Sequence, residues 1–192
     1  MNPETKHKAR RQELFAKITE LISEEGYANL TVREICHKLE ISTGTFYHYF
    51  PEKGDLVWVL FADIDDFFKN HVVSKFIDYE PENLITYCIE YGNYATKNGV
   101  ETCRLISVAP LNSNSHNYLD ENRSIFQTLL QIIIRGVDKK QFILTCSPEE
   151  TARMLIIVLR GFSSDWAKRN GNYDLSQSLK NFAELFCKSL TL

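Results

Sequence analysis

The chain has 192 residues, of which 44% are apolar and 24% are charged, and its formal net charge is −3. This profile suits a globular protein with a sizeable core, and the nearly balanced charge excludes a general nucleic-acid coat. No apolar run approaches the roughly 20 residues that span a bilayer, and the polar N-terminus does not resemble a signal peptide. We therefore expect a cytoplasmic protein with no membrane segment.

The five cysteines are widely spaced along the chain: Cys36, Cys88, Cys103, Cys146 and Cys187. An odd count without an export signal argues against a disulfide framework, and no CxxC pair suggests zinc. We interpret most of them as small buried residues. A redox role for Cys88 and Cys103 stays open.

Residues 1–9 are expected to form a loose arm, which carries Lys6, His7 and Lys8 against one acid, Glu4. This arm is either a solvated tail or a contact to DNA. The first helix should follow it and end at Gly26, which can adopt the left-handed conformation. Apolar residues recur on one face of this helix at three- and four-residue steps: Leu14, Phe15, Ile18, Leu21 and Ile22.

Residues 31–50 predict two short helices joined by a tight turn at residues 40–41. Thr31 and Glu34 have the spacing of a capping box, and Ser42 can cap the second helix. Phe46 and Phe50 should point inward, and the opposite face of the second helix carries small or flat polar groups and a glycine. This is the pattern of a helix-turn-helix, whose second helix enters the major groove of DNA.

Residues from about 10 to 60 resemble the TetR family of bacterial transcriptional regulators. The resemblance is carried by Gly26-Tyr27, by LTVREI at residues 30–35, by ISTGTFYHYF at residues 41–50, and by Lys53 before Asp55-Leu56. It implies an all-α protein with an N-terminal three-helix DNA-binding head and a C-terminal helical domain for ligand binding and dimerisation. We place the head at residues 1–50 and the effector-binding and dimerisation domain at residues 51–192.

The candidate DNA-binding residues lie on the first helix, on the helix-turn-helix and just after it: Arg10, Arg11, Thr31, Arg33, Ser42, Thr43, Gly44, Thr45, Tyr47, His48 and Lys53. Residues 1–56 hold eight lysines and arginines against nine acids, so the head is not basic overall. DNA binding therefore requires the acids to face away from the basic residues, and it predicts modest non-specific affinity.

Beyond the head, a long helix is expected from Pro51 to about Phe76, with a start that can hold a phosphate beside Lys53. Its acids Asp63, Asp65 and Asp66 lack the further ligands that would complete a metal site. A tyrosine-rich helix should run from Pro81 to about residue 97, a short one over residues 99–110, and a buried one over residues 119–139.

Two amphipathic helices are predicted at about residues 148–170 and 174–190. Ser147 and Pro148 form a strong helix start, and Asp174 can cap the last helix. That helix carries Leu175, Leu179, Phe182, Phe186 and Leu190 at coiled-coil-like steps. The resemblance implies that both helices pair with their copies in a homodimer. The alternative is that they close the chain's own core.

We expect a small-molecule effector to bind between the long helix and the helices at 81–97 and 119–139. The candidate ligand-binding residues favour an apolar or flat effector: Phe61, Asp65, Phe68, Tyr87, Tyr91, Cys103, Phe126 and Leu130. Ordinary core packing is the alternative for each of them.

The predicted function is that of a homodimeric, sequence-specific transcriptional regulator. It would bind double-stranded DNA at a near-palindromic operator. The resemblance implies a repressor that a small-molecule effector releases as the commoner behaviour, and activation stays open. The alternative is a helical ligand-binding or adaptor protein that no longer binds DNA. We expect no enzyme, catalytic residue, metal or cofactor, because the sequence shows no nucleophile–base set, phosphate-binding glycine loop or metal cluster.

Overall fold

The computed structural model describes residues 3–26, 29–108 and 120–190, apart from the side chains of residues 3–4, 23, 57–62 and 108. Within those ranges every regular element is helical, which confirms the predicted all-α class. The head contains α1 (Pro3–Glu25), α2 (Val32–Lys38) and α3 (Thr43–Tyr49). The body contains α4 (Asp55–Phe67), α5 (Glu80–Val108), α6 (Ser124–Asp138), α7 (Pro148–Lys168) and α8 (Leu175–Leu190). No helix in the described ranges is long and apolar enough to cross a membrane.

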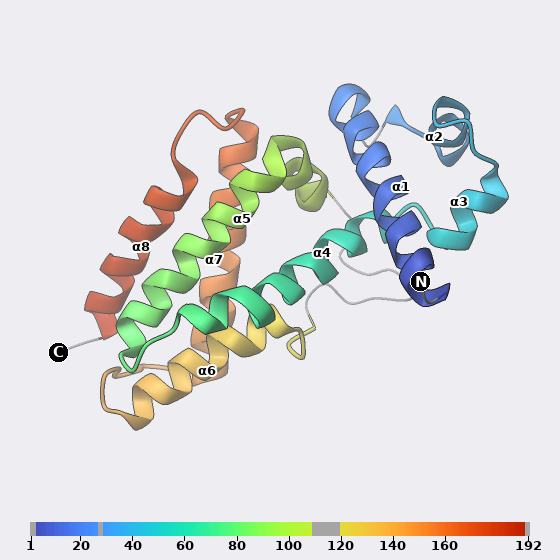
Figure 1. Ribbon diagram of the computed structural model, residues 1–192. Helices are drawn as coiled ribbons and strands as arrows, with labels where there is room; N and C mark the ends of the chain where they lie inside the picture. The colour runs from blue at the N-terminus through green and yellow to red at the C-terminus, as the bar shows by residue number, and fades with distance from the viewer. Residues whose placement is uncertain (1–2, 27–28, 109–119, 191–192) are drawn as a thin grey trace.

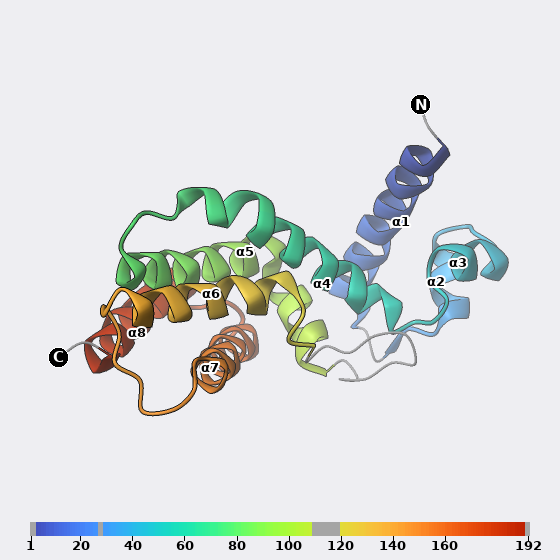
Figure 2. The same cartoon turned by 90° about the horizontal axis from the view of Figure 1, so that it is seen from below.

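The head lies at one end of the molecule, and α4 runs from it along the body (Figures 1 and 2). A small apolar core holds the head together, and it is the core predicted from the sequence. Its central side chains are almost fully shielded from solvent: Leu14, Ile18, Ile22, Ile35, Phe46, Phe50 and Leu56. Leu105 of α5 also enters this core, so the head is packed directly against the body.

The body is built around α5, which packs against α6, α7 and α8. Its core is formed by fully buried apolar residues from each of these helices: Leu84, Tyr87, Leu129, Ile132, Ile133, Leu159 and Leu179. The approach of α5 to α8 is close because Gly92 has no side chain. A Cβ at Gly92 would lie 2.8 Å from Cα of Ser176, nearer than real Cβ atoms come to other atoms.

The expectation of a loose arm at residues 1–9 is wrong for the described part, because α1 begins at Pro3. Proline suits the first position of a helix, since its fixed φ matches and its missing N–H would have no partner there. The first turns of α1 also have a partner on α3. The ring of His7 lies 4.8 Å from that of Tyr49 and 5.2 Å from that of His48, centroid to centroid.

The long helix starts later and ends earlier than predicted. It begins at Asp55 because the Asp55 carboxylate accepts a hydrogen bond from the Glu52 amide at 2.8 Å, which holds residues 51–54 in a turn. After Phe67 the backbone widens into a π-helical turn (Phe68–Val72) and then tightens into a 3₁₀ turn (Val73–Lys75). Lys53 therefore lies in the turn that leads into α4.

The two helices predicted at 81–97 and 99–110 are one element with a kink at Gly99, whose φ of +85° favours glycine. The helix predicted at 119–139 begins at Ser124, because Asp120 accepts hydrogen bonds from Asn122 and holds a turn ahead of it. The last two helices start as predicted. The hydroxyl of Ser147 accepts from the Glu150 amide at 3.1 Å, and Asp174 accepts from the Gln177 amide at 2.9 Å.

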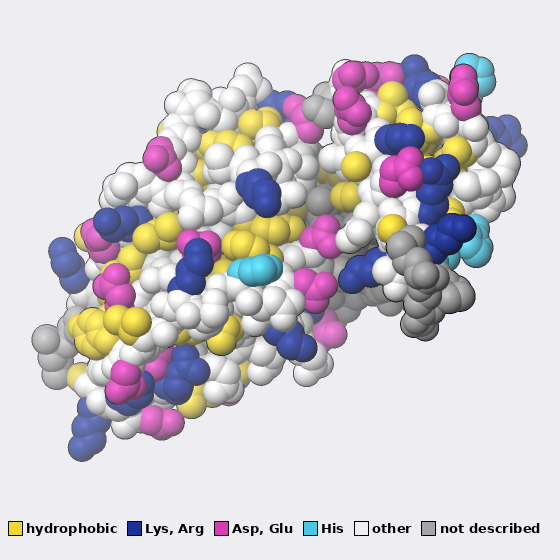
Figure 3. All heavy atoms as spheres, in the orientation of Figure 1, with side chains coloured by type: hydrophobic (Ala, Val, Ile, Leu, Met, Phe, Trp, Pro, Cys, Tyr) yellow, Lys and Arg dark blue, Asp and Glu magenta, His cyan; other side chains and the backbone are white. Residues whose placement is uncertain are grey.

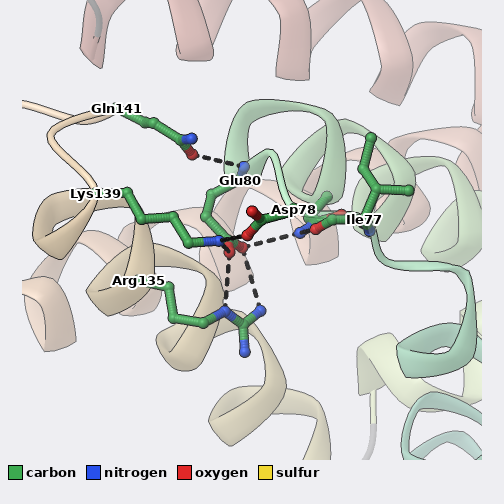
Figure 4. A network of polar contacts seen from close by, with 7 residues as sticks. Ile77, Asp78, Glu80, Arg135, Lys139 and Gln141 are labelled. Atoms are coloured by element: carbon green, nitrogen blue, oxygen red, sulfur yellow. Dashed lines mark hydrogen bonds and ion pairs between the residues drawn. The ribbon is translucent and has the colours of Figure 1, made fainter.

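A polar network joins the start of α5 to the end of α6, at the end of the body away from the head (Figures 1 and 4). Glu80 is 1% exposed, and its carboxylate accepts from Arg135 Nε and Lys139 Nζ, both at 2.9 Å. Its amide donates to the side chain of Gln141 at 2.8 Å. Asp78 contacts Lys139 from the solvent side. A buried carboxylate held by two cations fixes the relative position of the two helices.

Candidate nucleic-acid interface and ligand cavity

The helix-turn-helix is held in place by the caps that its sequence predicts. The Thr31 amide donates to the Glu34 carboxylate at 2.6 Å, and the Glu34 amide donates to the Thr31 hydroxyl at 3.2 Å. The hydroxyl of Ser42 accepts from the Thr45 amide at 2.9 Å. Between the two helices Glu40 has a φ of +53°, which makes the turn tight. These local bonds fix the orientation of α3.

The outer face of α3 is open to solvent. Tyr47 is 50% exposed, and Thr43, Gly44 and His48 are also exposed, with Thr45 half-buried beside them. A Cβ at Gly44 would meet only the Ser42 hydroxyl, at 3.6 Å, so the protein itself does not require glycine there. Phe46 and Phe50 are fully buried on the opposite face, as predicted. The result is a rigid polar surface about two helical turns long.

The basic candidates around α3 have different surroundings. Arg11 donates to the Tyr49 carbonyl at 3.3 Å, and its guanidinium lies 5.5 Å from the centre of the Phe50 ring, so it braces α1 against α3. Thr31 and Arg33 are exposed at the start of α2. Lys53 is half-buried, and burial lowers its pKa although the nearby Glu34 carboxylate opposes the effect.

Acids and bases are not segregated on the head as DNA binding was expected to require. Arg10 pairs with Glu13 at 2.7 Å, and Lys38 pairs with Glu25 at 2.8 Å. In the view of Figure 3, basic and acidic side chains are mixed on the surface of the head. Such pairs reduce the positive field that a phosphate backbone would meet.

A cavity of about 320 Å³ lies between α4, α5, α6 and α7. This volume is at the lower end of the range for small-molecule sites. Most of its wall is apolar or aromatic: Ile64, Tyr91, Tyr94, Ala95, Ile106, Ile125 and Ile156. The described lining also includes two arginines, Arg123 and Arg160, and no aspartate or glutamate.

Two of the candidate ligand-binding residues, Tyr91 and Cys103, line this cavity. Asp65 lies next to it and binds Arg123. Phe68, Tyr87, Phe126 and Leu130 are buried in the body core and are not part of the cavity wall. Phe61 belongs to α4, but its side chain is outside the described residues.

Several wall residues were not identified from the sequence. Tyr94 is three residues after Tyr91 on the same helix face, so the spacing could have predicted it as a second wall residue. Ile156, Arg160 and Ser163 lie on the inner side of α7, whose sequence was interpreted only as core or dimer contact. Arg123 precedes α6, so no helical periodicity in the sequence could predict which way its side chain points. It reaches the cavity because α4 and α6 meet there.

Burial shifts the pKa of two side chains of the cavity wall. It raises the pKa of the Cys103 thiol to about 11, and it also raises the pKa of Tyr94, with Asp63 and Asp65 adding to the effect. All five cysteines are free of disulfides. Since the thiolate is the reactive form, Cys103 is a poor redox sensor in this environment.

Asp65 and Arg123 connect the last turn of α4 to the first turn of α6. Nε of Arg123 donates to Asp65 Oδ2 at 2.9 Å, and the Ile125 amide donates to Asp65 Oδ1 at 2.9 Å. Arg123 is the N-cap residue of α6 but makes no capping bond with its own side chain. Asp65 therefore caps α6 from another helix.

The last turns of α5 touch both the cavity and the head. Thr102, Cys103 and Ile106 line the cavity, and Leu105 is buried in the head core, against which Ile106 also packs. The kink at Gly99 directs this segment toward α1. One short helical segment therefore lies against both the cavity and the head core.

The outer faces of α7 and α8 carry exposed apolar side chains. Ile157 is 58% exposed, Leu185 is 66% exposed and Met154 is 45% exposed. Phe162, Phe182 and Phe186 form a half-buried aromatic row beside them. The opposite face of α8 closes the chain's own core through Leu175, Leu179, Ala183, Cys187 and Leu190. The expectation that α8 closes the chain's own core is therefore confirmed for this face, and pairing through the exposed face stays a prediction.

The fold and site define a two-part helical protein, with a helix-turn-helix head and a body that encloses a cavity. Residues 14–58 match the family described as bacterial regulatory proteins, tetR family. This match to the TetR family covers the head, from the middle of α1 to the first turn of α4.

Two curated relatives share the N-terminal region. The transcriptional regulator HbdR of Aromatoleum sp. is 30% identical over 63 residues, which are 33% of this chain and 28% of HbdR. The transcriptional regulator AcuR of Cereibacter sphaeroides is 33% identical over 67 residues, which are 35% of this chain and 31% of AcuR. The matches thus span less than a third of either relative.

Solved structures match the fold over nearly the whole chain. The fatty acid degradation regulator FadR from Bacillus halodurans is 20% identical with a TM-score of 0.74, over 93% of this chain and 98% of that one. FadR from Bacillus subtilis, in complex with stearoyl-CoA, is 18% identical with a TM-score of 0.70, over 92% of this chain and 96% of that one. At these identities the likeness shows the fold.

Proposed function

We propose that the protein is a homodimeric, sequence-specific transcriptional repressor that a small-molecule effector releases from its operator. Residues 1–50 form the DNA-binding domain, and residues 51–192 form the effector-binding and dimerisation domain. The observation that carries the proposal is the exposed polar face of α3, held by caps on both helices of the helix-turn-helix and by the buried Phe46 and Phe50.

In this function α3 enters the major groove. Thr43, Thr45 and His48 reach base edges and phosphates, and Tyr47 reaches a phosphate. Gly44 lets the DNA backbone approach the helix. Lys53 meets a phosphate near the start of α4. The remaining candidates contact the backbone on either side of α3: Arg10, Arg11, Thr31, Arg33 and Ser42. Because Arg10 and Lys38 are paired with acids, specific contacts contribute more than non-specific attraction.

A second copy of the chain covers the exposed apolar face of α7 and α8. Ile157 and Leu185 are large apolar residues, each more than half exposed on neighbouring helices, beside the half-buried phenylalanines. Pairing this face with itself buries them in a four-helix arrangement with two-fold symmetry. The dimer then presents two α3 helices to the half-sites of a near-palindromic operator.

The effector occupies the cavity between α4 and α7. An apolar wall with two arginines and no acid among its described residues suits a molecule with an apolar part and an anionic group. The stearoyl-CoA bound by the structurally similar FadR of Bacillus subtilis has both parts, which supports this effector class.

Effector binding reaches the head through α4 and through the segment of α5 after Gly99. Ile106 lines the cavity and packs against the head core, so an effector that moves it shifts the head. The effector must bind the DNA-free form more tightly, by about 1–3 kcal/mol in typical allosteric coupling. Altered spacing of the two heads then weakens operator binding.

Selection of bound duplexes from a random DNA pool by the purified protein tests this function. We expect enrichment of a two-fold symmetric motif whose half-sites are about one helical turn apart or more. A protein that reads DNA in this way acts in the cytoplasm. If no sequence is enriched while the cavity still binds ligands, the alternative of a ligand-binding or adaptor protein replaces the regulator.

A further inference from the structure

One arginine of the cavity wall, Arg123, is also bonded to α4, the helix that follows the DNA-binding head. Arg123 lines the cavity, and its Nε donates to Asp65 at 2.9 Å. The Arg123 side chain is only 9% exposed. A buried guanidinium interacts strongly with any carboxylate or phosphate near it, because little water screens the charge.

Asp65 depends on the first turn of α6. Its two oxygens accept one bond each, from Arg123 Nε and from the Ile125 amide, so the last turn of α4 is attached to α6 through this carboxylate. The other end of α4 follows directly on the helix-turn-helix. A change at Asp65 therefore changes the direction of the helix that carries the head.

We propose that Arg123 exchanges partners: it binds Asp65 in the form that binds DNA and the anionic group of the effector in the released form. This inference rests on the proposed function. An anion in the cavity attracts the guanidinium that Asp65 binds, and it repels the Asp65 carboxylate. Effector binding and the attachment of α4 to α6 therefore compete for one guanidinium, and Arg123 both selects an anionic effector and transmits its arrival.

The variant Asp65→Asn separates these roles. Its amide oxygen can still accept the Ile125 amide, but the negative charge that binds Arg123 is gone. We expect about tenfold weaker operator binding and, by linkage, about tenfold tighter binding of an anionic ligand. Arg123→Gln should also weaken operator binding but should lose the preference for an anion. Thermal unfolding of both variants verifies that the fold is kept.

Decanoate and decanol serve as test ligands, because they share an apolar chain and differ in charge. Binding is measured by calorimetry on the full-length dimer, and operator affinity is measured on the duplex found by selection. The control variant is Arg153→Gln, which removes another arginine of an arginine–acid pair, with Glu121 at 2.6 Å. It should change neither affinity, because Arg153 is not part of the cavity wall.

The inference is overturned if wild-type protein binds decanoate no better than decanol, including the case in which neither binds. It is also overturned if Asp65→Asn keeps wild-type affinity for both operator and decanoate, since anion and Asp65 would then share Arg123 without competition. Failure of the proposed function is a different result, in which the wild-type protein enriches no DNA sequence at all.

Discussion

The carboxylate of Glu80 lies against the guanidinium of Arg135, with Oε1 at 2.9 Å from Nε and Oε2 at 3.2 Å from Nη2. Asn83 donates to the same carboxylate at 2.9 Å, and Lys139 completes the group. Glu80 is the buried member, whereas Arg135 and Lys139 remain partly exposed. The pair therefore holds the far end of the body together at the junction of α5 and α6.

The first prediction concerns the contribution of this group to stability. Glu80→Gln leaves Arg135 and Lys139 without their common buried anion, and we expect a loss of roughly 2 kcal/mol in the free energy of unfolding, below the value for fully buried pairs because both cations reach solvent. Denaturant unfolding measures it. The matched control is Asp78→Asn, which removes a carboxylate of the same network that is 95% exposed. An equal loss of unfolding free energy in both variants would contradict the conclusion that the buried Glu80 carboxylate stabilises this junction.

The second prediction concerns the pH dependence of stability. Burial alone would raise the pKa of Glu80, but the hydrogen bonds from Arg135, Asn83 and Lys139 outweigh it and lower the pKa below the ordinary 4.5. A carboxylate with a lowered pKa in the folded state stabilises the protein above pH 4.5, and this contribution disappears as the pH falls through the folded-state value. Wild-type protein should therefore lose more stability between about pH 5 and pH 3 than Glu80→Gln. If the stability of the two proteins falls with pH in parallel, Glu80 is not one of the groups that make the fold sensitive to acid.

The sequence predicted best the features that depend on neighbouring residues. Thr31 with Glu34, Ser42, and Ser147 with Pro148 each act within three residues, so their caps can be recognised without the fold. The start of α4 was misplaced because Pro51 is a good first helical residue, yet the Asp55 carboxylate sets the start through a bond to Glu52.

The cavity was harder to predict because its wall depends on how helices cross. Tyr87 and Tyr91 are one turn apart on the same face of α5 and cannot be distinguished by periodicity. In the structure Tyr87 donates to the Ile125 carbonyl inside the core, whereas Tyr91 faces the cavity. Arg123 pairs with Asp65, which is 58 residues earlier in the chain, and no local pattern records such a pair.

The third prediction concerns the DNA-binding surface. The double variant Tyr47→Ala and Lys53→Ala should weaken binding to all sequences alike and reduce the salt dependence of binding, because it removes phosphate contacts rather than base contacts. Electrophoretic mobility shifts at several salt concentrations measure both effects. Tyr79→Ala is the control, since Tyr79 is 49% exposed but lies on the body. An unchanged salt slope would exclude the two residues from the phosphate contacts.

The fourth prediction concerns the dimer. Leu185→Glu places a charge on the apolar face of α7 and α8 at a side chain that is 66% exposed and outside the chain's own core, so it should give folded monomers in light scattering. Ile143→Glu is the matched control, because Ile143 is 55% exposed in the segment between α6 and α7. If Leu185→Glu remains dimeric, the two copies meet through another surface.

The last prediction compares two glycines that have open space around them. A Cβ at Gly99 or at Gly161 would meet no atom within 4 Å, but Gly99 has a φ of +85° whereas Gly161 lies inside the regular part of α7. Gly99→Ala should cost about 1–3 kcal/mol, because L residues are strained at this φ and ψ. Gly161→Ala should not destabilise the chain and can gain up to about 1 kcal/mol from helix propensity.

Denaturant unfolding of the two glycine variants tests whether packing of the segment after Gly99 against the head holds the kink of α5 in place. Leu105, six residues after Gly99, is 2% exposed in the head core, so straightening the helix at Gly99 would withdraw it from that core. If Gly99→Ala is as stable as wild type, the segment after the kink can leave the head at little cost. It could then not transmit a change in the cavity to α1, and the coupling would have to pass through α4 alone.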